Sequence, residues 1–207
     1  MKVFDSGMPD ESYWNSLFDI PPIIDWLDLE SLTGPIAEIG CGYGTFTVPV
    51  AMRTSQPVHV IDIDPEMIRT ASEHCTAAGV RNVVFHCRDV LEVGTGLPTD
   101  SMGMVLLINI LHSPERTLIL KEASRIVRRA GRVAVIHWRK DIPTPRGPSV
   151  QSRPDLPVIL ESVAGLDLRL FGRERILEPF HWGVQLVKRD EKCSAGNKDR
   201  PSGGNGL

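Results

Sequence analysis

The chain has 207 residues, of which 42% are hydrophobic and 24% charged, and its formal net charge is −3. A chain of this length and composition can bury a core without a metal or disulfide framework, and it is unlike disordered, fibrous or membrane-spanning proteins. Its acidic balance gives no general attraction to nucleic acid or anionic lipid, so we expect neither a nucleic-acid nor a membrane partner.

The four cysteines form no C-x-x-C pair and have no metal-ligand spacing, so we expect reduced thiols and no metal site. Residues 1–18 mix charged with apolar side chains, unlike a signal peptide. The longest strongly apolar run, 105–111, is far shorter than the roughly 20 residues that a membrane helix needs. Together these features predict a soluble, cytoplasmic protein.

Apolar runs alternate with segments of helical period, a pattern typical of a parallel sheet covered by helices. Before the first strand, residues 10–32 predict one or two short helices broken at Pro21-Pro22. The predicted strands are 36–40, 58–62, 82–87, 104–110, 132–138, 167–171 and 181–187, the last two forming a hairpin. The predicted helices are 45–53, 65–78, 114–127 and 158–164.

Turn and capping residues set several boundaries. Thr45 is the expected N-cap of the helix 45–53, and four prolines predict an irregular loop over 142–157. We therefore expect an N-terminal helical segment (1–34), a main α/β domain (35–188) and a tail (189–207). The tail has little to bury and is predicted to be disordered.

A glycine-rich turn follows the first strand, in the run Glu38-Ile39-Gly40-Cys41-Gly42-Tyr43-Gly44-Thr45. Glycines at alternate positions permit a sharp turn and a close ligand approach, because no Cβ intervenes. Asp62 lies 18 residues after Gly44 (62 − 44), at the end of the second strand. A carboxylate there can accept hydrogen bonds from a ribose diol, whereas Asp64 before Pro65 fits a helix N-terminus better.

The glycine spacing separates two cofactor classes. A dinucleotide fingerprint is G-x-G-x-x-G, and the position of its third glycine is Thr45. Neither Tyr13 nor Tyr43 is followed by lysine four positions later, so a Tyr-x-x-x-Lys reductase site is absent. An NAD(P)-dependent oxidoreductase is therefore an alternative that the spacing opposes.

The pattern E-x-G-x-G-x-G resembles motif I of the class I S-adenosylmethionine-dependent methyltransferases, and V-I-D-I-D-P-E-M-I resembles the end of their second strand. Arg88-Asp89-Val90 is similar to their adenine-edge segment, 105–111 to their fourth strand, and 123–138 to the helix and strand that follow. The run H-W-R-K-D-I-P-T-P-R-G-P resembles a group of small methyltransferases. The resemblance covers about residues 13–189. It implies a Rossmann-like, mostly parallel seven-stranded sheet with helices on both faces and an antiparallel last strand.

The resemblance also implies S-adenosylmethionine as cofactor and S-adenosylhomocysteine as product. The implied cofactor-binding residues are Glu38, Gly40, Cys41, Gly42, Gly44, Asp62, Ile63, Asp89, Val90 and Asn109. The glycines would line the methionine moiety, and Glu38 would orient the loop or the amino group. Asp62 would hold the ribose, Ile63 would pack on the adenine, and Asp89 with Val90 would contact the adenine edge.

Two positions depart from the family pattern. Gly103 stands where an acid is usual early in the fourth strand, and Arg129-Ala130-Gly131 stands where Pro-Gly-Gly is usual before the fifth. Both lie away from the expected cofactor face, so they concern stability more than binding.

Methyl transfer from a sulfonium needs an aligned nucleophile and exclusion of water, so no fixed catalytic side chain is expected. Candidates beyond the carboxyl ends of the strands are His112, Arg139, Arg146 and His181. Each histidine also fits a structural role, and His137, inside a strand, is expected in the core. Arg139, Lys140, Arg146 and Arg153 lie in the loop over this face. They predict either contacts to an anionic substrate group or a solvated loop.

Tyr13, Trp14 and Phe18 precede the first strand on a predicted helix. They form either a lid over the cofactor or a helix packed on the sheet edge. The sequence thus predicts an enzyme that transfers methyl groups from S-adenosylmethionine to a small molecule. A non-catalytic S-adenosylmethionine-binding regulator is a further alternative, and monomer and homodimer both stay open.

Overall fold

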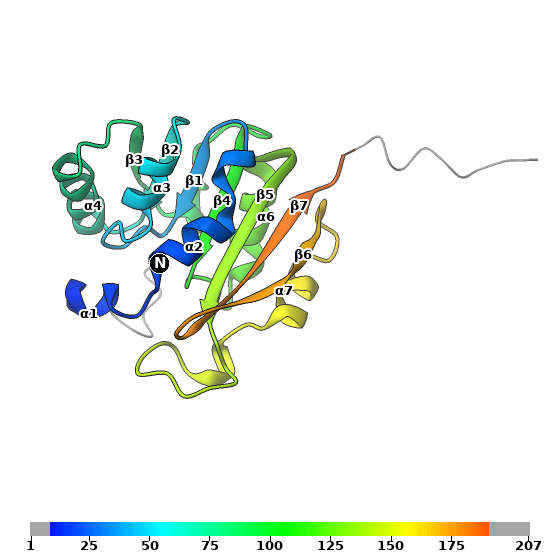
Figure 1. The fold of residues 1–207 in the computed structure, drawn as a ribbon. Coiled ribbons are helices and arrows are strands. Elements are labelled where there is room, and N and C mark those ends of the chain that lie inside the picture. Colours follow the sequence, from blue (N-terminus) through cyan, green and yellow to red (C-terminus); the bar gives the residue numbers. More distant parts are fainter. Residues whose placement is uncertain (1–8, 191–207) are drawn as a thin grey trace, which may run out of the picture.

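The computed structural model describes residues 9–190, which form one seven-stranded sheet with helices on both faces (Figure 1). The strands are β1 (Ile36–Ile39), β2 (Val58–Asp62), β3 (Val83–Cys87), β4 (Met102–Ile108), β5 (Val127–Trp138), β6 (Leu168–Leu177) and β7 (His181–Lys188). The α-helices are α1 (Glu11–Asn15), α2 (Ile20–Leu27), α3 (Thr47–Arg53), α4 (Pro65–Ala77), α5 (Val90–Val93), α6 (Arg116–Ile126) and α7 (Leu156–Ser162). Two single 3₁₀ turns, η1 (Leu29–Ser31) and η2 (Val150–Ser152), complete the described elements.

The sheet has the strand order β3-β2-β1-β4-β5-β7-β6. Pairings among the first five strands are parallel, whereas β7, the last strand in the sequence, is antiparallel to both β5 and β6. The predicted Rossmann-like sheet with an antiparallel last strand is therefore confirmed, and so is the terminal hairpin. The carboxyl ends of β1, β2, β4 and β5 meet at one edge of the sheet, where open α/β sheets bind ligands.

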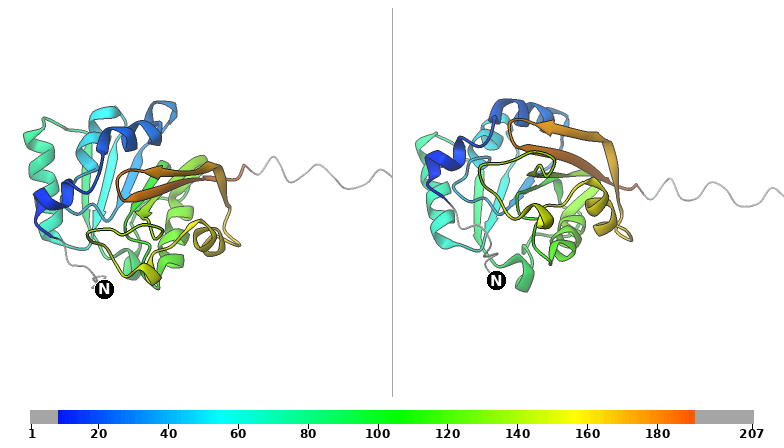
Figure 2. Two further views of the ribbon diagram at one scale, coloured as in Figure 1. Left: turned by 60° about the horizontal axis from the view of Figure 1, so that its bottom comes forward. Right: turned by 90° about the horizontal axis from the view of Figure 1, so that it is seen from below.

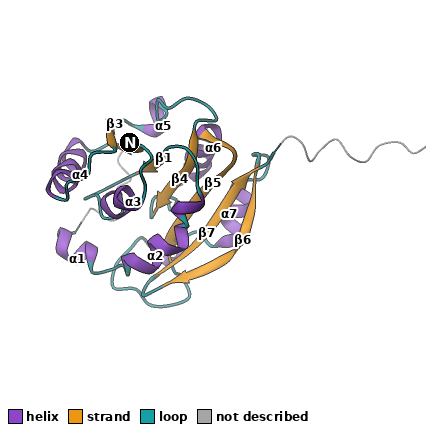
Figure 3. Cartoon of the chain, turned by 45° about the horizontal axis from the view of Figure 1, so that its top comes forward, coloured by secondary structure: helices purple, strands orange, loops and turns teal. Residues whose placement is uncertain are grey.

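Two apolar clusters lie on the two faces of the sheet. Residues of α2, α3 and α4 pack in one cluster, and residues of α6 and α7 pack in the other. Figures 2 and 3 show the arrangement of these helices around the sheet. Every residue of β4 is buried, as its continuous hydrophobicity predicts for a central strand covered on both faces. Within the described residues, no helix combines the length and apolar character needed to cross a bilayer.

The N-terminal helices differ from the expectation. The break between α1 and α2 lies at residues 16–19, and Pro21-Pro22 belong to the first turn of α2. Backbone N–H groups in a first helical turn have no intrahelical acceptor, so proline is well tolerated there. The two prolines therefore begin a helix, and the prediction that they break one is wrong.

Other boundaries also move, and the largest shift is in β6, which runs to Leu177, six residues beyond its predicted end at 171. Phe46, not Thr45, is the N-cap of α3, because the Thr45 hydroxyl instead donates to Asn15 Oδ1 at 2.7 Å. The strand β5 begins five residues earlier than predicted, since Val127 already pairs with Met102. The helix α7 begins at Leu156, inside the predicted loop. The four-residue helix α5 was not predicted.

The two departures from the family pattern lie close together. A Cβ on Gly103 would lie 2.3 Å from the carbonyl oxygen of Thr33, so no side chain fits there without a backbone shift. Ala130 has a φ of 58°, a left-handed conformation that favours glycine, within the irregular start of β5. Both positions are at the end of the sheet opposite to the carboxyl ends of β1 and β4.

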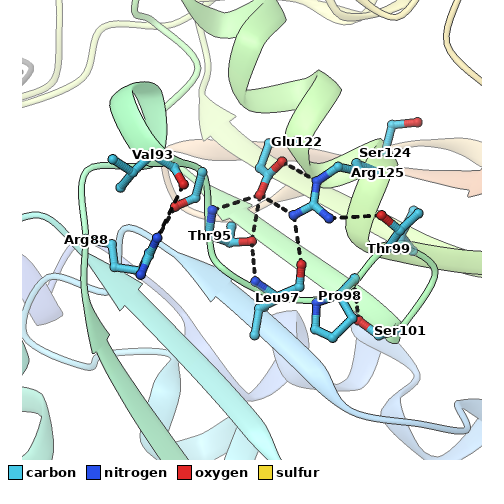
Figure 4. Close-up of polar contacts among 12 residues, drawn as sticks. Arg88, Val93, Thr95, Leu97, Pro98, Thr99, Ser101, Glu122, Ser124 and Arg125 are labelled. Carbon is cyan, nitrogen blue, oxygen red and sulfur yellow. Dashed lines mark hydrogen bonds and ion pairs between the residues drawn. The ribbon is translucent and has the colours of Figure 1, made fainter.

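The crossover from β3 to β4 is fastened to α6 by Glu122 (Figure 4). One carboxylate oxygen accepts hydrogen bonds from the backbone N–H and the hydroxyl of Thr95, at 2.8 and 2.7 Å. Arg125 pairs with the same carboxylate at 2.7 Å and donates to the carbonyl oxygen of Leu97. These contacts, with Arg125 foremost, lower the pKa of Glu122 to about 2.

Residues 191–207 of the predicted tail lie outside the described residues. Lys188 ends β7, and its ammonium group donates to Asp100 and to the carbonyl oxygens of Ser124 and Val127.

Candidate ligand-binding site

A cavity of about 240 Å³ opens at the carboxyl ends of the parallel strands. The turns after β1 and β2 form one half, which we call the glycine-loop half; its lining includes Glu38, Gly40, Cys41, Gly42, Asp62 and Ile63. The segments after β4 and β5, together with α1, form the other half, which we call the aromatic half; its lining includes Trp14, Asn109, Ile110, His112, Trp138, Arg146 and Pro148.

Backbone conformation shapes the glycine-loop half. Gly40, Gly42 and Gly44 have φ values of 80°, 53° and 81°, which favour glycine. A Cβ on Gly40 would lie 2.8 Å from Cγ2 of Ile110, and one on Gly44 would lie 3.1 Å from the Cα of Ala71. The glycines therefore let the Ile110 side chain and α4 pack close to the turn, where added side chains would clash.

Asp62 closes the glycine turn from the neighbouring strand. Its Oδ2 accepts the N–H of Gly42 at 3.1 Å, and its Oδ1 accepts the N–H of Asp64 at 2.9 Å. Burial raises the pKa of this carboxyl, and the two N–H groups counteract that rise. Each carboxylate oxygen has two lone pairs, so Asp62 retains acceptor capacity toward the cavity that it lines.

Glu38 is a buried acid at the end of β1. Its exposed fraction is 2%, and its Oε2 accepts the hydroxyl of Thr47 at 2.5 Å, which joins the strand to the start of α3. Burial raises the pKa of Glu38 to about 8. Burial also raises the pKa of the neighbouring Cys41 thiol, so this cysteine is a poor nucleophile.

Asn109 lies at the end of β4 and lines the aromatic half. Its φ is 56°, and its side-chain amide is 3.1 Å from Nε2 of His181. The His181 ring is fully buried, with ring centroids 4.3 Å from those of both Phe18 and Trp138. Burial, with a smaller effect of the Arg153 charge, lowers the pKa of His181 to about 3. His181 therefore supports Asn109 from behind as a neutral ring and does not itself line the cavity.

The other two histidines of this region differ in exposure. His112 lines the cavity, and its ring centroid is 5.8 Å from that of His137. His137 is fully buried in β5, where the sequence analysis expects a core residue. Burial holds its pKa well below the usual value.

The four basic residues of the loop after β5 have different roles. Arg146 lines the cavity. Arg139 donates to both carboxylate oxygens of Asp141, at 3.0 and 2.8 Å. Lys140 pairs with Asp155. Arg153 is buried and donates to the carbonyl oxygens of Pro148 at 3.0 Å and Arg139 at 2.6 Å, so it holds the loop together.

The N-terminal aromatic residues divide between the two predicted roles. Phe18 lies between α1 and α2, so its predicted place on a helix is wrong; it is buried and packs against Phe46 and His181. Trp14 lines the cavity and meets Trp138 edge-on, with ring centroids 6.4 Å apart. Tyr13 is 41% exposed. The cover over the cavity is thus one tryptophan on a helix of which no residue is buried.

Two predicted adenine-edge residues are not brought to the cavity. Asp89 caps α5 by accepting the N–H of Leu91 at 2.9 Å, and neither Asp89 nor Val90 is among the lining residues. Conversely, the sequence analysis missed Trp138, Phe46 and Met67, which do line it. Trp138 could have been found from its position, since it ends a strand of the parallel sheet.

Comparison with known proteins agrees with this geometry. Residues 36–131 match the sequence model of a family described as a methyltransferase domain, which spans the glycine turn, β2 and β4. The matched residues are thus similar to a class I S-adenosylmethionine-dependent methyltransferase domain. The match ends in β5, so Trp138 and the loop that follows lie beyond it.

Two curated relatives act on named compounds. Aklanonic acid methyltransferase DauC of Streptomyces sp. (strain C5) is 31% identical over 109 residues, which cover 51% of this chain and 49% of that protein. The 27-O-demethylrifamycin SV methyltransferase of Amycolatopsis mediterranei (strain S699) is 29% identical over 114 residues, covering 54% and 41%. The chain thus spans half or less of the length of these relatives. Other matches are methyltransferases of ribosomal RNA and of a ribosomal protein.

Among solved structures, a SAM-dependent methyltransferase from Aquifex aeolicus superposes with a TM-score of 0.72. Its sequence is 21% identical, and the superposition covers 86% of this chain and 94% of that one. At this identity the likeness establishes the methyltransferase fold over nearly the whole described chain.

Proposed function

We propose that this protein transfers a methyl group from S-adenosylmethionine to a small-molecule acceptor. The observation that carries the proposal is the glycine-loop half of the cavity. Gly40 and Gly42 line it without a Cβ, and the Asp62 carboxylate lines the same space. A narrow backbone cradle beside an acid at the end of the next strand suits an adenosyl ligand.

The residues present fit the two polar parts of this cofactor, the ribose and the amino-acid portion. Asp62 would accept hydrogen bonds from the ribose hydroxyls, because its oxygens keep lone pairs beyond the two loop N–H groups. Gly40 and Gly42 would pass beside the amino-acid portion, and Ile63, which is 37% exposed, would cover the adenine. The roles of Asp89 and Val90 at the adenine edge stay a proposal that needs α5 to move.

When bound, S-adenosylmethionine supplies an electrophilic methyl group on a sulfonium. The chain's own residues then have to position the acceptor and exclude water from the aromatic half. Trp14 and Trp138 present apolar surface suited to a flat acceptor, and the Arg146 guanidinium is placed to bind an anionic group on it. His112 is the side chain of the cavity best suited to accept a proton from a hydroxyl nucleophile.

A small molecule is favoured over a macromolecule on two grounds. The net charge is −3, and the basic side chains of the loop after β5 have partners within the protein. Two of the relatives described above are named for small compounds. The cysteines Cys41, Cys75 and Cys87 are free thiols, in keeping with a cytoplasmic setting.

The experiment is to measure S-adenosylhomocysteine release from S-adenosylmethionine with cell extract divided by ultrafiltration. We expect release to require the low-mass fraction, and to fall strongly in Asp62→Asn but not in Asp19→Asn, a matched change outside the cavity lining. Release that required the RNA or protein fraction would contradict the small-molecule acceptor. Binding without release in any fraction would favour a regulatory module.

A further inference from the structure

Among the described residues, one face of the β2–β3 edge of the sheet is only partly covered: Ile61 on this face is fully buried, whereas other side chains there are accessible. Val83 and Phe85 pack toward the cluster that contains α4, whereas Val84, which points to the other face, is 43% exposed. The crossover that follows β3 contains only the four-residue helix α5, which is too short to cover this face. Side chains of β2 and β3 are therefore accessible there.

Two histidines share this face. His59 pairs in register with Val84, and Ile61 pairs with His86, so the two rings are diagonal neighbours on adjacent strands. Nδ1 of His59 lies 3.1 Å from Nε2 of His86, and the ring centroids are 5.4 Å apart. Both rings are half-buried. Each is held by a hydrogen-bonded strand, so this separation does not depend on a loop.

The two facing nitrogens belong to different imidazole rings. A neutral imidazole is the ligand form for zinc, copper and nickel. The Arg88 guanidinium is directed to the carbonyl oxygens of Val93 and Gly94, which leaves the shared nitrogens unobstructed on that side.

We propose that His59 and His86 together bind one divalent transition-metal ion, with zinc as the representative. Two nitrogens at about 2.0–2.1 Å from one zinc ion in a tetrahedral site lie about 3.3 Å apart, close to the 3.1 Å observed. A small rotation of the rings turns both lone pairs toward a common point. This site is separate from the methyltransferase cavity, since neither histidine lines it.

Proton balance in this step is simple. In the free pair, one ring donates its N–H to the other, and on metal binding that proton moves to the other nitrogen of the same ring. No net proton leaves the protein when both rings are neutral. Within residues 9–190, no group of three or more His, Cys, Asp or Glu could hold a metal, so water completes the coordination. The affinity should accordingly be micromolar.

The test is calorimetric titration of the untagged full chain with zinc chloride at a pH above the imidazole range. We expect one saturable micromolar site, whose affinity falls about tenfold or more in His59→Asn and in His86→Asn. His74→Asn is the matched control, because that ring lies on α4 and contacts the carbonyl oxygen of Tyr43. It should leave zinc affinity unchanged.

A second readout separates metal binding from loss of fold. Metal-free thermal melts of each variant should match the wild type within a few degrees, and His86→Gln serves as a replacement if His86→Asn does not fold. Addition of cobalt(II) should give a visible absorption band in the wild type and not in the two variants. The absence of saturable zinc binding up to millimolar concentration, or equal affinity in the wild type and His86→Asn, would overturn the proposal.

Discussion

The two halves of the cavity are built by different means. The glycine-loop half is made by backbone conformation within two short segments, at residues 38–44 and 62–64. The aromatic half is made by side chains from distant parts of the chain: Trp14 on α1, Asn109 after β4 and Trp138 at the end of β5. His181 at the start of β7 supports it from behind. One methyl group added to a glycine of the turn can change the shape of the glycine-loop half. The shape of the aromatic half depends instead on packing between distant segments.

This difference suggests that the two halves of the cavity recognise different ligand groups. A backbone cradle recognises an invariant part of a ligand, because it leaves little room for variation. A surface of side chains on α1 and on the loop after β5 can change from protein to protein while the sheet stays the same. The family match covers the first half and, of the aromatic half, Asn109, Ile110 and His112; it ends before Trp138 and the loop after β5. The predictions below test this difference from the largest effect to the smallest.

Replacement of Trp138 by alanine should have the largest effect. The side chain is 2% exposed and contacts the rings of Trp14 and His181, so its removal should lower the free energy of unfolding by about 3–5 kcal/mol. Trp14→Ala, on a helix without buried residues, should lower it by only about 1 kcal/mol. Urea unfolding followed by circular dichroism measures both. Equal losses would show that α1 belongs to the core.

Gly40→Ala should damage the other half without any loss of packing. The residue would adopt a φ of 80°, at roughly 1–2 kcal/mol, and its Cβ would lie 2.8 Å from Ile110 Cγ2, within the cavity lining. We expect affinity for S-adenosylhomocysteine to fall about tenfold or more. The control is Gly79→Ala, with a φ of 70° and nothing within 4 Å of the added Cβ.

Gly79→Ala should lose comparable stability and keep ligand affinity. Calorimetry with S-adenosylhomocysteine separates the two glycine variants. If both lost affinity equally, the glycine-loop half would be sensitive to global stability instead of local shape.

Arg146→Ala tests whether the aromatic half binds an anionic acceptor. Arg146 lines the cavity, whereas Arg139 is held by Asp141. With an acceptor in hand, KM should rise about tenfold in Arg146→Ala, corresponding to one hydrogen-bonded charge pair. KM should stay the same in Arg139→Ala, and an unchanged KM in both variants removes Arg146 from the account.

The two halves should also respond to pH in opposite directions. Burial raises the pKa of Glu38 from 4.5 to about 8, so its contribution to stability is present below pH 4.5 and is lost as pH rises through 8. Burial lowers the pKa of His181 from 6.5 to about 3, so its contribution is present above pH 6.5 and is lost as pH falls through 3.

Urea unfolding across the pH range checks this opposition. Glu38→Gln should flatten the decline in the free energy of unfolding between pH 4.5 and about 8. His181→Phe, which keeps an aromatic ring beside Phe18, should flatten the acid decline. If each variant flattened the limb assigned to the other, or neither changed its slope, the assignment would fail.

The sheet could be predicted from the sequence because its signals are local. Periods of hydrophobicity located all seven strands, and Val58–Asp62 has the predicted bounds. The glycine turn and Asp62 were found for the same reason, since the φ values and the strand-end position are properties of short segments. The prediction that Thr45 caps α3 is wrong, because its hydroxyl donates to Asn15, thirty positions earlier in the chain.

The aromatic half could not be predicted because contacts between distant segments decide it. Nothing in the sequence near Arg139, Lys140 or Arg146 tells which of them pairs with Asp141 or Asp155 and which lines the cavity. Likewise, His181 is placed behind Asn109 only through the antiparallel return of β7 beside β5.

The most direct test of the account is calorimetric titration of the protein with S-adenosylmethionine, S-adenosylhomocysteine and NADH. The account predicts saturable binding of both adenosyl ligands, strong weakening in Asp62→Asn, no change in Asp19→Asn, and no binding of NADH. Binding of NADH alone, or adenosyl binding unaffected by Asp62→Asn, would contradict the assignment of the glycine-loop half to S-adenosylmethionine.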